Sequence, residues 1–289
     1  TWDVPSVNFL GAVDDGAGKW VNGFWADALH PNPSGHDELL TTFVPTLFDA
    51  LARGKAQPTW SRAASHLRSS RGAAIVQYTP SGVMHPFALG LTVRAQGDGA
   101  VATIEGATLS ASTVRHAIVR DGRPTTEVDW TTLTPGAPFT AAVGLRNGVW
   151  TYTSSRGATI ASTVRADSGW HTVLVSHYTA RGETLFFVDG RLAGTTPERL
   201  ETKRFGLGGG PRAADAAAPA AVDMKDLLVY RSALNADEAL ALRQGALLQS
   251  SLEVYAPLAD TKVSPGVALE NRAQSTTAPT VVSAGPATK

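Results

Sequence analysis

The sequence contains no cysteine among its 289 residues. Disulfide bonds and thiolate metal sites are therefore excluded. It also lacks an excess of charge of either sign, because 25 Lys and Arg residues balance 25 Asp and Glu residues. This balance gives no electrostatic reason to expect binding to nucleic acid or to an anionic membrane surface. No apolar run approaches the length that spans a bilayer, so no membrane-spanning segment is expected.

A signal peptide is also missing from the start of the chain, which begins at Thr1 without a basic segment or an apolar core. We therefore expect either that a leader was removed or that the sequence is a piece of something longer. Hydrophobic residues make up 43% of the chain. This share is enough to bury a sizeable core, in one large domain or in two ordinary ones.

The first 55 residues have a mixed α/β pattern. Residues 4–10, VPSVNFL, are a short apolar run that predicts a buried strand. Ser34 stands three residues before Asp37, a spacing similar to a capping box, so a helix is expected to begin there. Pro45 lies inside this helical pattern and predicts a kink. The apolar positions that keep a three/four spacing are Leu40, Phe43, Val44, Leu47, Phe48 and Leu51.

Asp27 and His30 lie between the predicted strand and helix, in the segment DALHPNPSGHDELL. In a Ser-His-Asp site the histidine is the general base, and the carboxylate fixes its tautomer and stabilises the imidazolium. Pro31 and Pro33 would stiffen a loop that places the two side chains together. On the spacing alone, however, a loop aspartate and a half-buried histidine are the simpler interpretation.

Residues 4–52 as a whole resemble the last part of the SGNH (GDSL) hydrolases, in which an Asp-x-x-His-Pro motif follows a strand and opens the final helix. The resemblance implies that Asp27 is the orienting carboxylate, that His30 is the base, and that His36 is structural. The family's nucleophilic serine lies in a Gly-Asp-Ser block near the start of its domain. No such block occurs in the 26 residues before Asp27. The serine is therefore expected upstream or on a second chain that carries the rest of the hydrolase domain.

From about residue 73 the pattern changes to short alternating segments separated by turns that contain glycine. Asn147-Gly148 and Asp189-Gly190 are two-residue hairpin signals. Many short strands at this spacing predict a β-sandwich. Asn235, with Glu238 three residues on, predicts one short capped helix within the β region.

The segments GWHTVLVSHYTARGETLFFVDGRLAGT and MKDLLVYRSALNADEALAL resemble the central hairpin and the following strand and helix of laminin-G-like, concanavalin A-like domains. Trp170 and Tyr230 are expected to be core or sheet-face aromatic residues. Some relatives bind Ca²⁺, so a calcium site in the sandwich is left open, although no dense cluster of oxygen ligands supports it and no other cofactor is expected. His171 and His177 lack a third ligand and are interpreted as solvent-facing strand residues.

The expected fold is therefore mainly β: a concanavalin A-like β-sandwich (jelly roll) preceded by a strand-loop-helix fragment of an α/β SGNH hydrolase domain. The expected divisions are a hydrolase part over residues 1–55, a linker over 56–72, the sandwich over 73–260 and a tail over 261–289.

Three functions fit these expectations. The first is the C-terminal portion of a secreted or cell-surface serine esterase, with a lectin-like domain appended. Its substrate could be the O-acetyl groups of a polysaccharide, by analogy with that pairing. The second is a non-catalytic module that binds carbohydrate or protein, and the third is a structural part of a larger assembly. The fold alone does not choose between them.

Overall fold

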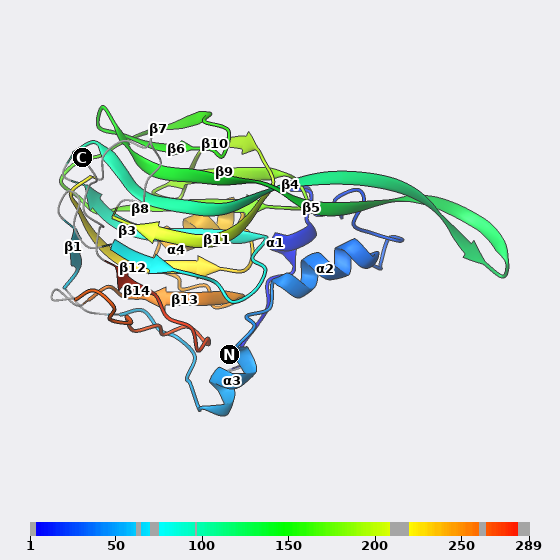
Figure 1. Ribbon diagram of the computed structural model, residues 1–289, viewed down its shortest axis with the longest axis horizontal. Coiled ribbons are helices and arrows are strands. Elements are labelled where there is room, and N and C mark those ends of the chain that lie inside the picture. Colours follow the sequence, from blue (N-terminus) through cyan, green and yellow to red (C-terminus); the bar gives the residue numbers. More distant parts are fainter. Residues whose placement is uncertain are drawn as a thin grey trace.

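Two antiparallel sheets packed face to face form the body of the protein in a computed structural model (Figure 1). The model describes residues 4–61, 65–69, 75–95, 97–208, 220–259 and 264–282. Within these residues each sheet has 7 strands. The first runs in the order β1-β12-β3-β8-β9-β10, with β13 also beside β12, and the second in the order β14-β2-β11-β4-β5-β6-β7. The expected β-sandwich is confirmed.

The bounds of the elements follow. The helices are α1 (Leu10–Val13), α2 (Pro33–Thr41), α3 (Leu47–Ala52) and α4 (Ala236–Arg243). The first sheet contains β1 (Leu67–Ser69), β3 (Phe87–Ala95), β8 (His171–Tyr178), β9 (Glu183–Val188), β10 (Arg191–Pro197), β12 (Val222–Tyr230) and β13 (Leu252–Ala256). The second contains β2 (Ile75–Tyr78), β4 (Gly99–Arg120), β5 (Arg123–Arg146), β6 (Val149–Thr153), β7 (Thr159–Arg165), β11 (Leu200–Leu207) and β14 (Thr280–Val282).

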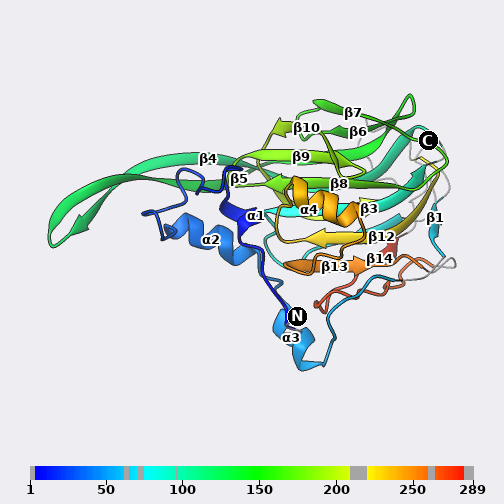
Figure 2. The ribbon, with the colours of Figure 1, turned by 180° about the vertical axis from the view of Figure 1, so that it is seen from behind.

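The core lies between the inner faces of the two sheets. Alternate residues of β3 point into it, namely Phe87, Leu89, Leu91 and Val93, as expected from the period of two along a strand. The second sheet contributes large residues such as Trp150, which is fully buried. On the outer face of the first sheet a second apolar cluster is covered by α4 (Figure 2).

The short-range predictions in the β region are confirmed. Asn147 and Gly148 turn the chain with φ angles of 54° and 68°, and Asp189-Gly190 does so with 50° and 73°. These left-handed angles are those that a tight hairpin requires. Asn235 caps α4, and the reciprocal bonds of a capping box with Glu238 are both present.

A long two-stranded ribbon was not predicted. Strands β4 and β5 have 22 and 24 residues, and they pair from Gly99 opposite Leu145 to Arg120 opposite Arg123. Their outer half projects away from the sandwich (Figures 1 and 2). It carries exposed apolar side chains, including Val114 and Val119.

The strand predicted over residues 4–10 is wrong. Residues 4–9 have no regular structure, and α1 follows them. Asn8 explains the difference, because its Oδ1 accepts a hydrogen bond from the Gly11 N–H (3.2 Å) and its own N–H donates to Ser251 Oγ (2.8 Å). These backbone groups are thus satisfied by a local turn and by the sandwich, and they do not need a neighbouring strand.

The helix predicted after Ser34 exists, but its N-cap is Asn32. Asn32 Oδ1 accepts from the Gly35 N–H (2.9 Å), and Pro33 occupies the first turn, where a missing N–H costs nothing. The helical pattern breaks between α2 and α3, at the segment that contains Pro45, as predicted. The predicted apolar face is only partly buried: Val44 and Leu47 are buried, whereas Leu40 and Phe48 are 68% and 75% exposed.

The segments on either side of the predicted sandwich also contribute strands. Residues 67–69, within the predicted linker, form β1 and pair with β12. Within the predicted tail, residues 280–282 form β14 and pair with β2, and Leu269 and Ala273 are buried. Residues 261–263 and 283–289 of that tail lie outside the described residues.

A buried ion pair joins several of these parts. Arg231 and Glu253 are both almost fully buried and form a salt bridge between β12 and β13. Arg231 also donates to the carbonyl oxygens of Ser81 and Val83 (2.6 Å each). From the second sheet, the Tyr78 hydroxyl donates to Glu253 Oε1 (2.6 Å), so the pair links the two sheets.

Removing one partner would leave the other charge buried. We expect Arg231→Met to lower the free energy of unfolding by about 3–5 kcal/mol, as measured by urea unfolding. Arg115→Met is the control, since Arg115 pairs with Glu127 at 68% exposure of both side chains and should change stability little. Equal stability of the Arg231 variant and the native protein would contradict a structural role for the pair.

Candidate functional site

Asp27 and His30 do come together in the structure. His30 Nδ1 lies 2.9 and 3.0 Å from the two carboxylate oxygens of Asp27. The N–H groups of Leu29 (2.8 Å) and His30 (3.0 Å) also donate to Asp27 Oδ1. The Leu29 bond first, and then the bond from the His30 ring, lower the pKa of Asp27. An ionised aspartate on Nδ1 holds the ring proton there and leaves Nε2 as the basic nitrogen.

The loop that carries this pair is held by the backbone. The Ala26 N–H donates to the His30 carbonyl oxygen (2.9 Å), and Trp25 forms a bridge with Pro31. The His30 side chain is nevertheless 71% exposed. In the described part of the chain no hydroxyl forms a hydrogen bond with His30 Nε2. The structure therefore brings Asp27 and His30 together, whereas their catalytic roles stay a prediction.

Helix α2, which follows the Asp27–His30 pair, is held against the sandwich by a contact with a second histidine, His85. Glu38 on α2 is 2% exposed and lies 3.1 Å from His85 Nδ1, just before β3. Burial alone would lower the pKa of His85, but the hydrogen bond and the charge of Glu38 raise it above its usual value. Thr41 Oγ1 also donates to the His85 carbonyl oxygen. The loop before α2 contacts the ribbon, where Asn22 Nδ2 donates to Asp129 (3.1 Å).

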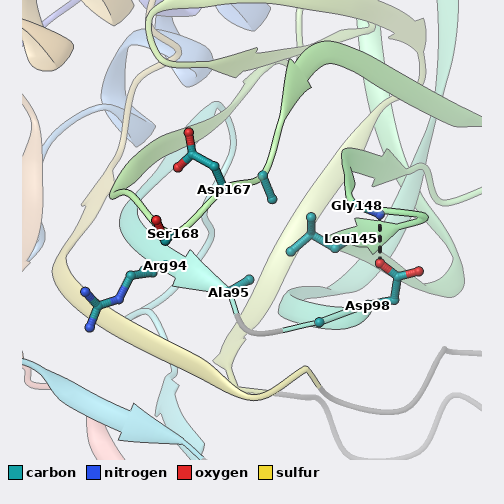
Figure 3. A pocket seen from close by; sticks show the side chains of 9 residues that line it. Arg94, Ala95, Asp98, Leu145, Gly148, Asp167 and Ser168 are labelled. Carbon is teal, nitrogen blue, oxygen red and sulfur yellow. Dashed lines mark hydrogen bonds between the residues drawn. The ribbon is translucent and has the colours of Figure 1, made fainter.

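A separate cavity of about 480 Å³ opens at the far end of the sandwich, where the chain leaves β3, turns from β5 into β6, and leaves β7 (Figure 3). We call it the end cavity. It is lined by Arg94, Ala95, Gly97, Asp98, Leu145, Gly148, Ala166, Asp167 and Ser168. Ala95, Leu145 and Ala166 pack against the core and give it an apolar floor. Charged and polar side chains stand around that floor.

Two carboxylates of the end cavity are held ionised. Asp98 accepts from the N–H groups of Gly148 (2.9 Å) and Asn147, which lower its pKa. Asp167 accepts from the Gly169 N–H (2.6 Å), which lowers its pKa, and lies 3.3 Å from His171 Nε2. Each carboxylate has more lone pairs than these bonds use, so both can accept hydrogen bonds from ligand hydroxyl groups.

The end cavity was missed in the sequence because three separate loops build it. Gly148 and Asp167 belong to local turns, whereas Asp98 bonds to the turn at residues 147–148, and no contiguous motif joins the three. The hairpin signal at Asn147-Gly148 was visible, but nothing in the sequence indicates that Asp98 caps that turn from a distance of 49 and 50 residues.

The two histidines of β8 were placed wrongly. His171 is 6% exposed and His177 is fully buried, because they share with Val173 and Val175 the face of β8 that meets the core. His171 Nδ1 lies 2.8 Å from Asp189 Oδ2. Burial lowers the pKa of His177 to about 3.

Two further observations concern the predicted aromatic residues and metals. Tyr230 is fully buried in the outer cluster under α4, as expected. Trp170 lies half-buried on the outer face of the first sheet. Among the described residues no group of three His, Asp or Glu side chains could hold a metal ion. In that same part of the chain no helix is long and apolar enough to cross a membrane.

No family model and no curated protein matches this chain. Among solved structures it is similar to a putative carbohydrate binding protein from Bacteroides ovatus ATCC 8483, with a TM-score of 0.50 and 11% identity over 77% of this chain and 59% of that chain. The chain thus spans less than two thirds of that protein.

Two other solved structures are also similar. For the SAP-like pentraxin from Limulus polyphemus the TM-score is 0.39 and the identity 8%, over 65% of this chain and 79% of that one. For the Ruminococcus gnavus IT-sialidase CBM40 bound to alpha2,3 sialyllactose the values are 0.40 and 13%, over 63% and 97%. At such identities the likeness to the Bacteroides protein shows the β-sandwich fold and nothing finer.

The Glu38–His85 pair predicts a pH dependence. The folded pKa of His85 is raised, so the pair stabilises the protein fully below the unfolded pKa of about 6.5 and less as the pH rises through the folded value. The urea midpoint should therefore fall between pH 6 and pH 8, and His85→Gln should flatten this fall. His36→Gln, an exposed change on α2, the helix that carries Glu38, should retain the fall in the urea midpoint. An unaltered slope in His85→Gln would refute the role of the pair.

Proposed function

We propose that the sandwich is a carbohydrate-binding module and that its ligand occupies the end cavity. The observation that carries this proposal is the composition of that cavity, which combines an apolar floor at Leu145 with ionised acceptors at Asp98 and Asp167. A sugar ring has apolar C–H faces and a rim of hydroxyl groups, so it matches both features. A cavity of about 480 Å³ also falls within the usual size of small-ligand sites.

Further support comes from the position of the end cavity and from the fold. It is formed by loops at the end of a rigid sandwich, the usual place for binding residues on such scaffolds. The Bacteroides protein, which shares the fold, is described as a putative carbohydrate binding protein. The side chains that line the cavity come from three separate parts of the chain (Figure 3), so a ligand there could contact several of them at once.

Filling the end cavity tests this proposal. We expect the full chain to bind members of a glycan array, and Ala166→Phe to weaken that binding about tenfold or more, because the ring would occupy the apolar floor. Ser112→Phe, an exposed change on the ribbon, is the matched control and should bind normally. Thermal melting of both variants checks that they fold. Undiminished binding by Ala166→Phe, or no glycan binding by the native chain, would overturn the proposal.

A second function is favoured by a different observation. We propose that Asp27 and His30 complete the active site of an SGNH-type serine esterase whose nucleophile lies on an upstream segment or on a second chain. The support is the bond from His30 Nδ1 to Asp27, which leaves Nε2 exposed and basic. The serine hydroxyl would give its proton to Nε2 as its oxygen attacks the ester carbonyl, and Asp27 would stabilise the resulting imidazolium. Residues 1–55 would then form the C-terminal part of that hydrolase domain.

The exposed apolar surface of the N-terminal segment also supports the proposal that a further part of the hydrolase domain packs on it. Large hydrophobic side chains in this segment are exposed at six positions, where a folded domain would normally bury most of them. They are Val4, Phe9, Leu10, Leu29, Leu40 and Phe48. A hydrolase core that packed on this segment would cover them and would bring its serine to His30. The substrate in this proposal is an acyl ester, such as an O-acetyl group on a polysaccharide.

The esterase proposal has a direct test. Natively purified protein is treated with a fluorophosphonate, and denaturing intact-mass analysis should find the label on a longer form of this chain or on a co-purifying chain. His30→Ala should slow labelling at least about 100-fold, because the serine loses its base. His36→Ala is the matched control and should label normally. Equal labelling of the His30 variant, or no labelling of folded native material, would rule the proposal out.

A further inference from the structure

A row of charged side chains crosses the outer face of the first sheet beside the end cavity. Asp223 on β12 lies directly opposite Arg68 on β1 and Arg94 on β3. Trp170 precedes His171, which pairs with Val93, so Trp170 comes next to Arg94 on the neighbouring strand. We call Arg68, Arg94, Lys225 and Trp170 the cationic row.

The carboxylate of Asp223 lies beneath the cations of this row. Asp223 is fully buried, whereas Arg68 is 65% exposed and Arg94 31% exposed. Arg68 Nε and Arg94 Nη2 each lie 2.7 Å from a different oxygen of Asp223. His66 Nε2 lies 3.4 Å from the same carboxylate. The carboxylate thus orients two guanidinium groups that still reach solvent, and the charge facing solvent is positive.

The ring of Trp170 contacts cationic side chains and is therefore less suited to stacking on a sugar. The Lys225 ammonium lies 4.7 Å from the ring centroid and the Arg94 guanidinium carbon 5.0 Å from it. His66 meets the ring edge-on at 5.4 Å. With two cations held over it, the indole positions positive charge through cation–π attraction. This is the sheet-face role expected for Trp170.

Lys225 adds a cation that no acid neutralises by contact. No carboxylate lies within ion-pair distance of its ammonium in the described part of the chain. The neighbouring Asp226 is turned to Tyr255, whose hydroxyl lies 3.3 Å from its Oδ1, and burial raises the pKa of Asp226. Among the described residues the row thus holds three permanent cations, and two of them, Arg68 and Arg94, pair with the buried Asp223 carboxylate.

Arg94 belongs both to the cationic row and to the lining of the end cavity. Figure 3 shows its guanidinium pointing outward, away from Leu145 and Asp98. A polysaccharide seated on the apolar floor would leave the end cavity beside Arg94 and meet Lys225 and Arg68 next. Because positive charge is exposed along this path, it suits a ligand that carries negative charge.

We propose, on the basis of the carbohydrate-binding function above, that the ligand is an acidic polysaccharide. Its carboxylate or sulfate groups are bound by Arg94, Lys225 and Arg68, while one sugar unit occupies the end cavity. Carboxylates and sulfates share the planar or trigonal arrays of oxygens that guanidinium groups bind with two parallel hydrogen bonds. The Asp98 and Asp167 carboxylates accept from hydroxyl groups of the same ligand.

The test compares acidic and neutral polysaccharides on the full chain. Biolayer interferometry is run with polygalacturonate (carboxylate), dextran sulfate (sulfate) and neutral pullulan and galactomannan, at 50 and 300 mM sodium chloride. At least one acidic polymer should bind in preference to both neutral ones, with an affinity that falls as salt rises. Whether polygalacturonate or dextran sulfate binds more tightly identifies the anionic group.

Matched variants test whether binding depends on the cationic row or on positive charge in general. Lys225→Gln should weaken binding of the acidic polymer about tenfold, and Lys225→Arg should restore most of it. Arg115→Gln removes an exposed cation of the ribbon and should have no effect. An equal loss in Arg115→Gln, or preference for a neutral polymer with no effect of Lys225→Gln, overturns the acidic-ligand inference and leaves carbohydrate binding standing. If no array glycan and no polymer binds, both proposals fail.

Discussion

Burial of two sheet faces against each other is the constraint on which the rest of this structure depends. Residues that alternate along β3 and β8 must point into one shared core, so every second residue is free to face outward. Part of the outer face of the first sheet is covered by α4, and another part carries the cationic row. Loops and a hairpin turn at one end of the two sheets form the end cavity. The outer faces and the ends are therefore the parts of the sandwich that are available for binding.

In the described part of the chain, the N-terminal segment contributes no residue to this core. Many contacts hold it on the sandwich, among them those of Glu38 with His85, of Asn8 with Ser251 and Glu238, and of Asn22 with Asp129. Some of its apolar side chains are buried, among them Val13, Phe24 and Leu47, whereas six large ones are exposed. The Asp27–His30 pair and the exposed apolar side chains are the features on which the esterase proposal depends. The two proposed functions thus belong to two different parts of the molecule.

Local features of the fold could be predicted from the sequence, and long-range ones could not. The turn at Asn147-Gly148 and the cap at Asn235 depend on neighbours in the chain, so the residue types were enough. The ribbon is a hairpin that turns at Asp121 and Gly122, with φ angles of 51° and 74°, so its turn was a local signal that was missed. The Glu38–His85 pair joins residues 47 positions apart and could not be predicted. The burial of His171 and His177 could have been found, because with Val173 and Val175 they occupy every second position of the strand and so share its apolar face.

The candidate sites divide in the same way. Asp27 and His30 share one loop, and their contact was predicted from a motif of four residues. The end cavity and the cationic row combine side chains from strands that are adjacent only after folding. Arg68, Arg94 and Asp223 have no sequence relationship that would predict their alignment across β1, β12 and β3.

The central claim is that the end of the sandwich binds a glycan. Hydrogen exchange of the full chain with and without saturating oligogalacturonate, and separately with a neutral cello-oligosaccharide, tests it most directly. The account predicts that one of these ligands slows exchange at residues 97–98, 147–148 and 166–169, with unchanged exchange along the ribbon. Protection confined to other surfaces, such as the outer face of the second sheet, or no protection with either ligand, would contradict it.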